Sequence, residues 1–199
     1  MSICGTFIGG PHPDTGRHFT IVEPQVGGWG ASADRDGTTA QFSSLHGDTF
    51  NCPAEVAEAR YGLYVDRLAL DDGPGGEGEH RGGKGIVVEY RVRADGCFFT
   101  CAYTRNKHRP WPQAGGLEGS PNYAEVARVD GTVEQFAVVT ALSVNEGDVI
   151  RIHTGNGGGF GDPRRRSPGA VLRDLRNGFA STEQALGVYG LAPEQLEGR

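Results

Sequence analysis

Short alternations of apolar and polar residues recur along the chain, and they predict strands more often than helices. In the first 47 residues, apolar and β-branched residues form short extended pieces between glycine turns. Residues 63–70 alternate more regularly, which predicts a strand with one well-buried face. Similar patterns predict later strands at 86–95, 97–105, 123–131, 132–144 and 148–155.

Turn residues between these patterns indicate antiparallel pairing. Asp95-Gly96 and Asp130-Gly131 are hairpin signals, because both residue types tolerate the positive φ of tight turns. Residues 71–85 form a long glycine-rich stretch with almost nothing to bury, which is typical of a flexible linker between strands. Pro110 and Pro112 mark an irregular excursion within the strand region.

Three short segments carry helix signals. Residues 53–61 begin with a proline suited to a first helical turn and stop at Gly62. Ser167 precedes a second amphipathic stretch, and Ser181 with Gln184 has the spacing of a capping box before a third. We therefore expect a mainly β (α+β) fold: an antiparallel, glycine-rich β domain over residues 1–165 with one short central helix, and a C-terminal pair of short helices over residues 166–199.

Composition and charge narrow the class of protein. Glycine supplies 33 of the 199 residues, so the chain must turn often. The formal charge of −6 argues against binding to nucleic-acid backbones, which requires clustered cations. The one dense basic run, Arg164 to Arg166, is interpreted as a solvated turn, with a docking patch for an acidic partner as the alternative. Neither a membrane span nor a signal peptide is recognisable, so we expect a cytoplasmic protein.

Three glycine runs invite comparison with phosphate-binding loops, which need a helix directly after the turn. Residues 73–78 fit GxGxxG, but β-branched residues follow. Residues 78–84 approach the other phosphate loop, yet Gly85 stands where a hydroxyl should bind magnesium. Residues 155–161 lead into Asp162-Pro163 instead of a helix. These glycines are expected to let backbone pass close to another segment or to a bound molecule.

Cysteine and histidine residues give no metal-site pattern. No paired CxxC spacing occurs, and Cys97 and Cys101 would lie about 13 Å apart on one strand face, at about 3.3 Å per residue. We expect buried, reduced thiols. The histidines are scattered and are interpreted as packing or surface residues.

Four ordered motifs nevertheless make the chain resemble a known family. They are "GGWGA" with "RDG" at 27–37, "NCPAEVAEARYGL" at 51–63, "GPGGEGEHRGGKGIVVEYRV" at 73–92 and "TGNGGGFGDPRRRSPGAVLRDLRNGFASTEQALGVYGL" at 154–191. Together they resemble the C-terminal portion of the B-type subunit of the hydantoinase B/oxoprolinase family. That family includes N-methylhydantoinase, 5-oxoprolinase, caprolactamase, and acetone and acetophenone carboxylases. Cys52 departs from the pattern, since the family usually has threonine there.

The resemblance implies a role inside an ATP-dependent carboxylase or a cyclic-amide (hydantoin, lactam or oxoproline) hydrolase. It implies a hetero-oligomer with an N-terminal B-type fragment, which would carry a divalent metal (zinc or manganese), and with an A-type subunit, which would bind ATP and Mg²⁺. This chain would be a separately encoded C-terminal part that holds neither cofactor and is inactive alone. The resemblance leaves carboxylation and hydrolysis equally open. A catalytically inactive binding or scaffold module of the same fold is the alternative.

Five residues are candidates for contacts with substrate or with a partner. Arg105 and His108 lie in "TRNKHRPWP", a cationic loop that could hold an anion through paired guanidinium contacts or form an interface. Asn51 and Glu55 could line a site, although capping of the first helix is the simpler interpretation. Arg81 could touch substrate or fix its own loop. No catalytic residue and no metal ligand is assigned.

Overall fold

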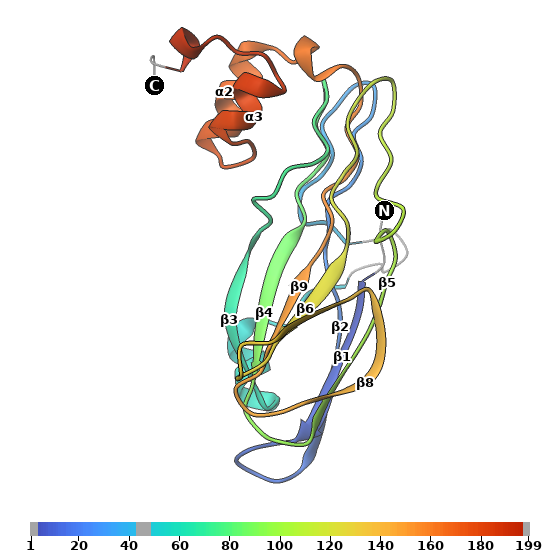
Figure 1. Ribbon diagram of the computed structural model, residues 1–199, viewed down its shortest axis with the longest axis vertical. Coiled ribbons are helices and arrows are strands. Elements are labelled where there is room, and N and C mark those ends of the chain that lie inside the picture. The colour runs from blue at the N-terminus through green and yellow to red at the C-terminus, as the bar shows by residue number, and fades with distance from the viewer. Residues whose placement is uncertain (1–3, 43–48, 197–199) are drawn as a thin grey trace.

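A computed structural model describes residues 4–42 and 49–196. The molecule is elongated, with two β-sheets at one end, extended glycine-rich segments in the middle and a pair of helices at the other end (Figure 1). The predicted β-rich fold with few helices is therefore confirmed. The division into residues 1–165 and 166–199 stays a prediction.

Nine strands form two antiparallel sheets. The first sheet has the order β2-β1-β5-β8, and the second has the order β3-β4-β9-β6-β7. The strands of the first sheet are β1 (Cys4–Pro11), β2 (His18–Pro24), β5 (Cys97–Tyr103) and β8 (Val138–Val144). Those of the second are β3 (Leu63–Leu70), β4 (Ile86–Val92), β6 (Tyr123–Ala127), β7 (Val133–Phe136) and β9 (Val149–His153).

The main hydrophobic core contains side chains from both sheets. Ile8 and Phe99 of the first sheet and Ile150 and Ile152 of the second are fully buried in it. These residues alternate with outward-facing neighbours along their strands, which is why the period-two patterns predicted the strands. Cys97 and Cys101 are buried free thiols, as expected, and burial raises the pKa of Cys101 to about 11.

Two strand predictions need correction. Residues 132–144 form two strands, β7 and β8, which lie in different sheets and are separated by Ala137. Residues 63–70 form one strand, β3, but Leu63 is its only buried residue, so the predicted well-buried face is not present. Of the extended pieces predicted in the first 47 residues, two form the strands β1 and β2. Residues 25–42 are irregular apart from one isolated bridge between Gly27 and Gln41. Residues 43–47 lie outside the described residues.

The three predicted helices are present: α1 (Ala54–Arg60), α2 (Pro168–Arg176) and α3 (Thr182–Gly187), with single 3₁₀ turns at η1 (Pro163–Arg165) and η2 (Pro193–Gln195). Ser167 caps α2, and Ser181 with Gln184 forms the predicted capping box of α3. Helices α2 and α3 pack around a second core that contains Val171 and Ala185. The C-terminal helix pair is therefore confirmed.

The glycine-rich segments form a bundle in which backbone packs against backbone. Gly157 N donates to Gly83 O at 2.9 Å, and Gly83 N donates to Trp29 O at 2.8 Å. A Cβ atom added to Gly157 would lie 1.9 Å from Trp29 O, so no other residue fits there. Of the two expectations for these glycines, close approach to another segment is the one that the structure shows.

This bundle bears on two of the glycine runs, residues 71–85 and residues 155–161. Residues 71–85 are not a flexible linker, because Gly76 and Gly82 to Gly85 are buried against the other segments. Lys84 is buried as well, and its ammonium donates to Gly73 O at 2.7 Å. Six of the seven amides of residues 155–161 donate to protein acceptors: those of Gly155, Asn156, Gly157, Gly159, Phe160 and Gly161.

Candidate functional site

The outward face of the second sheet carries alternating charges. Glu89 on β4, Arg151 on β9 and Glu125 on β6 are successive cross-strand neighbours. Arg151 contacts both carboxylates: its Nε lies 2.8 Å from Glu89 Oε1, and its Nη1 lies 3.1 Å from Glu125 Oε2. Arg67 on β3 extends the row, 4.0 Å from Glu89. Opposite charges in direct cross-strand register stabilise a sheet whose outer face meets water.

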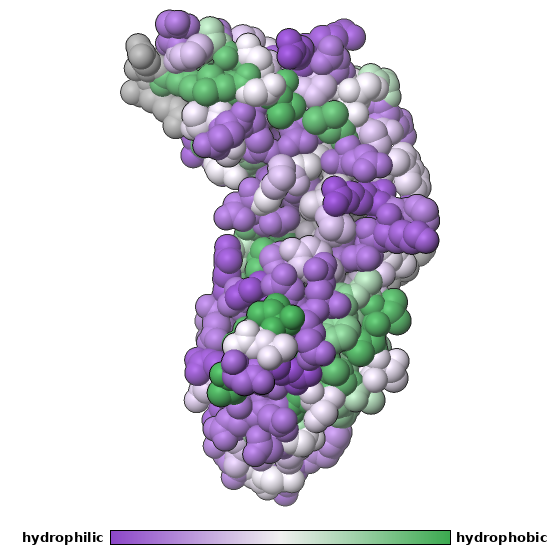
Figure 2. Space-filling view, in the orientation of Figure 1, coloured by the Kyte–Doolittle hydropathy of each residue, from purple (hydrophilic) through white to green (hydrophobic). Residues whose placement is uncertain are grey.

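The outward face of the first sheet is uncharged over its described residues. Its four strands contain a single Asp, Glu, Lys or Arg residue, Glu23, which is buried at 4% exposure. The outward side chains include Phe7, Val22 and Val138, of which the last two are 58% and 69% exposed. Figure 2 shows an apolar area on the flank that carries β5 and β8 in Figure 1. Apolar areas of this kind mark interaction surfaces.

An open depression of about 610 Å³ lies where β5 leads into the cationic loop. It is lined by Tyr103, Thr104, Arg105, Asn106, Lys107, His108, Ala137 and Val138. A smaller hollow of about 110 Å³ adjoins it through Arg105 and is lined mainly by Trp111, Gln113 and the glycine bundle. The structure thus brings two predicted site residues, Arg105 and His108, to one depression.

The backbone of Arg105 is held in an unusual conformation. Its φ is +59°, in the left-handed region that non-glycine residues rarely adopt. The carbonyl of Arg105 accepts a hydrogen bond from Asn122 N at 3.2 Å. The fully buried Asn122 side chain also accepts from Gly155 N and donates to Thr104 O, so it ties this turn to the glycine bundle. Conformations of this kind persist only where surrounding contacts fix them.

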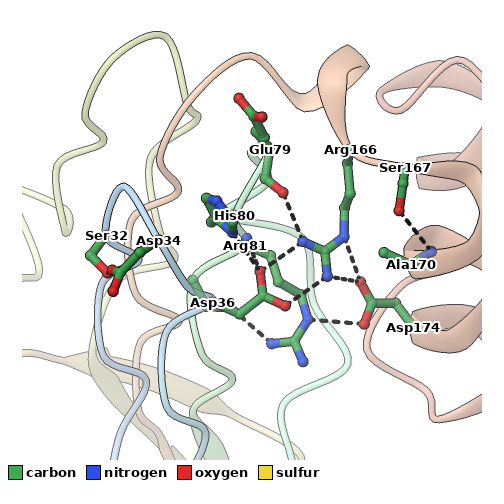
Figure 3. A network of polar contacts seen from close by, with 11 residues as sticks. Ser32, Asp34, Asp36, Glu79, His80, Arg81, Arg166, Ser167, Ala170 and Asp174 are labelled. Atoms are coloured by element: carbon green, nitrogen blue, oxygen red, sulfur yellow. Dashed lines mark hydrogen bonds and ion pairs between the residues drawn. The ribbon is translucent and has the colours of Figure 1, made fainter.

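Arg81 belongs to a buried ion-pair network where the glycine-rich segments meet α2. Figure 3 shows Arg166 between Asp36 and Asp174, with Arg81 beside both carboxylates. Arg166 donates to both Asp36 oxygens at 2.7 Å and to Asp174 Oδ2 at 2.9 Å, while Arg81 Nε donates to Asp174 Oδ1 at 3.1 Å. The Arg81 guanidinium also lies over the Phe179 ring. Arg81 therefore fixes its loop to α2.

This network corrects the expectation of a solvated arginine turn. Arg164 and Arg165 are exposed, but Arg166 is only 7% exposed because the network holds it against α2. Burial alone would raise the pKa of Asp36, but the hydrogen bonds and charge of Arg166 outweigh it and hold that pKa below its usual value. Burial opposes the charged form of Arg166, yet Asp36 and Asp174 raise its pKa above that of free arginine.

Asn51 and Glu55 lie at the start of α1 and do not cap it through their side chains. Pro53 occupies the N-cap position, and α1 has no side-chain cap. Asn51 instead donates to Glu23 Oε1 at 2.7 Å, and the same oxygen accepts from Cys52 N at 2.7 Å. Glu55 is exposed in the first turn of α1. The five candidate residues thus belong to three separate parts of the fold.

The sequence interpretation missed the residues that position the others. Asp174 carries a detectable signal, since it lies three residues after Val171 on the apolar face of α2, where a charged residue needs a buried partner. Asn122 carries no such signal. Its role depends on segments about twenty and thirty residues away, which the fold alone brings together.

Among residues 4–42 and 49–196, no group of three or more histidine, cysteine or acidic residues is arranged to hold a metal ion. Within the same residues, no helix has the length and apolar character needed to cross a membrane.

Comparisons with known proteins find this sequence and this fold as one part of longer chains. The sequence profile described as Hydantoinase B/oxoprolinase matches residues 1–163. The caprolactamase subunit beta of Pseudomonas jessenii is 30% identical over 189 residues, covering 91% of this chain and 32% of that subunit. The crystal structure of the ATP-dependent caprolactamase from the same organism superimposes with a TM-score of 0.78 at 27% identity, over 96% of this chain and 34% of that one.

A second solved structure shares the fold. Nucleotide-free acetone carboxylase superimposes with a TM-score of 0.81 at 19% identity, over 95% of this chain and 29% of that one. The chain spans between 11% and 32% of the length of the curated relatives that it matches.

Proposed function

Because the chain belongs to the hydantoinase B/oxoprolinase family, we propose that it supplies the C-terminal part of a B-type subunit in an ATP-dependent complex. In that role it helps to build the active site and to hold the assembly together. The rest of the B-type subunit and an A-type subunit are its partners, so that the working form is a hetero-oligomer.

One observation carries this proposal. Nearly the whole chain superimposes on the caprolactamase structure, yet it covers only 34% of that chain. The same fold therefore occurs there as one part of a larger polypeptide. A part of that kind has a surface that meets the remainder of the subunit.

The uncharged outward face of the first sheet is the surface that fits this role. Its occupant is the remainder of a B-type subunit, because the relatives carry that polypeptide in addition to the matched part. Phe7, Val22 and Val138 offer apolar area without a charge to desolvate, which favours burial against protein. The charged face of the second sheet then faces water.

We place the cofactors of the reaction on the partners. ATP with Mg²⁺ belongs to the A-type subunit, and the divalent metal belongs to the N-terminal B-type fragment. The hydrogen bonding of the glycine bundle supports the first assignment, since six amides of residues 155–161 already donate to protein oxygens and are not offered to a phosphate. The reaction is either carboxylation or the hydrolysis of a cyclic amide.

Reconstitution tests the proposal. The full chain is co-expressed with the remainder of a B-type subunit and an A-type subunit, and the purified complex is assayed for ADP release. Substrates are lactams and hydantoins in one arm, and ketones with bicarbonate in the other. We expect turnover in one arm that requires all three polypeptides. Turnover by the isolated chain, or equal turnover without it, would overturn the proposal.

The scaffold alternative gives a different result in the same experiment. A catalytically inactive module would join the complex, yet removing it would change yield or stability without changing turnover per assembled A-type subunit. Normalising ADP release to the amount of A-type subunit separates the two outcomes.

A further inference from the structure

We propose that the depression around Arg105 is a binding site for the carboxylate group of a small organic acid, the product or substrate of the complex. The assignment of that acid to the reaction depends on the function proposed above. The binding site itself follows from the charges and geometry of this chain.

Among the described residues, Arg105 has no carboxylate partner. The partly or fully buried arginines of the described residues are Arg81, Arg93, Arg105, Arg128, Arg151 and Arg166. Each of the others lies within 3.2 Å of a carboxylate oxygen. Within the described residues, the guanidinium of Arg105 has only an aromatic contact. A partly desolvated cation favours an anion, so the missing partner is expected from outside the chain.

Arg105 is held in a fixed position by its surroundings. Its Cζ lies 4.1 Å from the ring centroid of Trp111, so the indole supports one face of the guanidinium. Stacking on a ring leaves the N–H edges of the guanidinium available for a planar acceptor. The left-handed backbone fixed by buried Asn122 adds rigidity at the same position.

The charged residues that line the depression are cationic. Lys107 and His108 line it together with Arg105, and neither Asp nor Glu is among its described lining residues. The local field therefore favours an anion. A carboxylate matches the paired N–H donors of arginine. Hydrolysis of a cyclic amide breaks its C–N bond and leaves a carboxylate, and carboxylation adds one, so both candidate reactions produce this group.

The depression adjoins the proposed docking face. Val138 belongs to the uncharged outward face of the first sheet and also lines the depression, as does its neighbour Ala137. A partner that covers this face would reach the rim of the depression. The carboxylate site would then lie at the boundary between this chain and the remainder of the B-type subunit.

Tryptophan NMR signals test the site on the full chain. Acetate is titrated into ¹⁵N-labelled protein at constant ionic strength, with chloride as the replaced anion, and the two indole N–H signals are followed. We expect a saturable shift of Trp111 and none of Trp29, whose indole donates to Phe42 O elsewhere. A parallel titration with inorganic phosphate distinguishes a carboxylate site from a phosphate site.

Two matched variants identify the cation responsible. Arg105→Asn removes the charge while keeping a residue that tolerates the left-handed backbone. It should weaken acetate binding about tenfold or more, because a charge-assisted hydrogen-bond pair is lost. Arg109→Asn removes an exposed cation that lines neither hollow, and it should leave the affinity unchanged. An absent or non-saturable Trp111 shift, equal weakening by both variants, or tighter binding of phosphate would overturn the carboxylate assignment.

Assembly is measured on the same variants to separate this proposal from the proposed function. Arg105→Asn should still join the complex but should lower its turnover. If the complex forms and acetate does not bind, the carboxylate site is wrong and the proposed function stands. If acetate binds through Arg105 and no complex forms, the site stands and the proposed function is wrong.

Discussion

The two sheets contribute to one core and differ in their outward faces. The second sheet presents Glu89, Arg151 and Glu125 in cross-strand register, and Arg151 forms an ion pair with each of the two carboxylates. The first sheet presents Phe7, Val22 and Val138 with no charged neighbour among its described outward residues. Both faces belong to antiparallel sheets with buried inner sides, so the fold alone does not account for the difference.

The difference shows which face is adapted to water. A row of paired charges keeps a sheet hydrated and discourages association, whereas an uncharged apolar face loses little on burial. The second face is therefore suited to contact with water, and the first face is suited to burial against the companion polypeptide proposed above.

The largest expected effect on folding stability comes from reversing the central charge of the second face. Arg151→Glu would place three carboxylates side by side, at positions 89, 151 and 125. We expect the free energy of unfolding to fall by about 2 kcal/mol, from two lost ion pairs and new repulsion. Urea denaturation of the free chain measures it.

The same new residue on the first face is the control. Val22→Glu introduces a carboxylate at an exposed position of β2, where no charged outward neighbour lies on β1. Its effect on unfolding should stay within about 0.5 kcal/mol. Equal losses from both variants would show that the two faces do not differ in the way described.

Acid should weaken the charged face selectively. The Arg91 guanidinium donates two hydrogen bonds to Asp66 and lowers its pKa. Because the folded pKa lies below the unfolded one, the pair stabilises the protein above about pH 4 and this contribution is lost as pH falls further. Urea midpoints between about pH 6 and pH 3 should fall less steeply in Asp66→Asn than in the unchanged chain. An identical slope would contradict the assignment.

The smallest expected effect is that of salt on assembly. An uncharged interface has little charge to screen, so the Kd of the chain for its companion should change by less than about threefold between about 0.05 and 0.5 M NaCl. A steep loss of affinity in salt, measured by calorimetry or light scattering, would instead indicate that the charged face forms the interface.

Turn signals in the sequence predicted local conformation well and strand pairing less well. Gly96 and Gly131 both have the predicted positive φ. Asp130-Gly131 connects the paired strands β6 and β7, whereas Asp95-Gly96 leads from β4 of the second sheet into β5 of the first. The two dipeptides give the same signal in the sequence because a turn residue fixes only its own φ. Which strands then pair depends on which distant faces must be buried, and the dipeptide does not determine that.

The glycine bundle and the ion-pair network show the same limit. The sequence predicted that the backbone of residues 155–161 passes close to another segment or to a bound molecule, because glycine is the residue that permits such close contact. It could not indicate that residues 71–85 supply the opposing backbone, because neither segment has a side-chain pattern. Arg166 looked like its exposed neighbours, and only the position of Asp174 on α2 reveals the buried partner.

A matched pair of lysine substitutions tests the central claim most directly. Val22 on β2 and Val133 on β7 are both 58% exposed on edge strands, one on each outward face. The affinity of each full-length variant for the remainder of a B-type subunit is measured against the unchanged chain. Val22→Lys should raise the Kd about 100-fold or more, because it buries an unpaired charge, and Val133→Lys should leave it nearly unchanged. Equal effects, or a larger effect of Val133→Lys, would contradict the account.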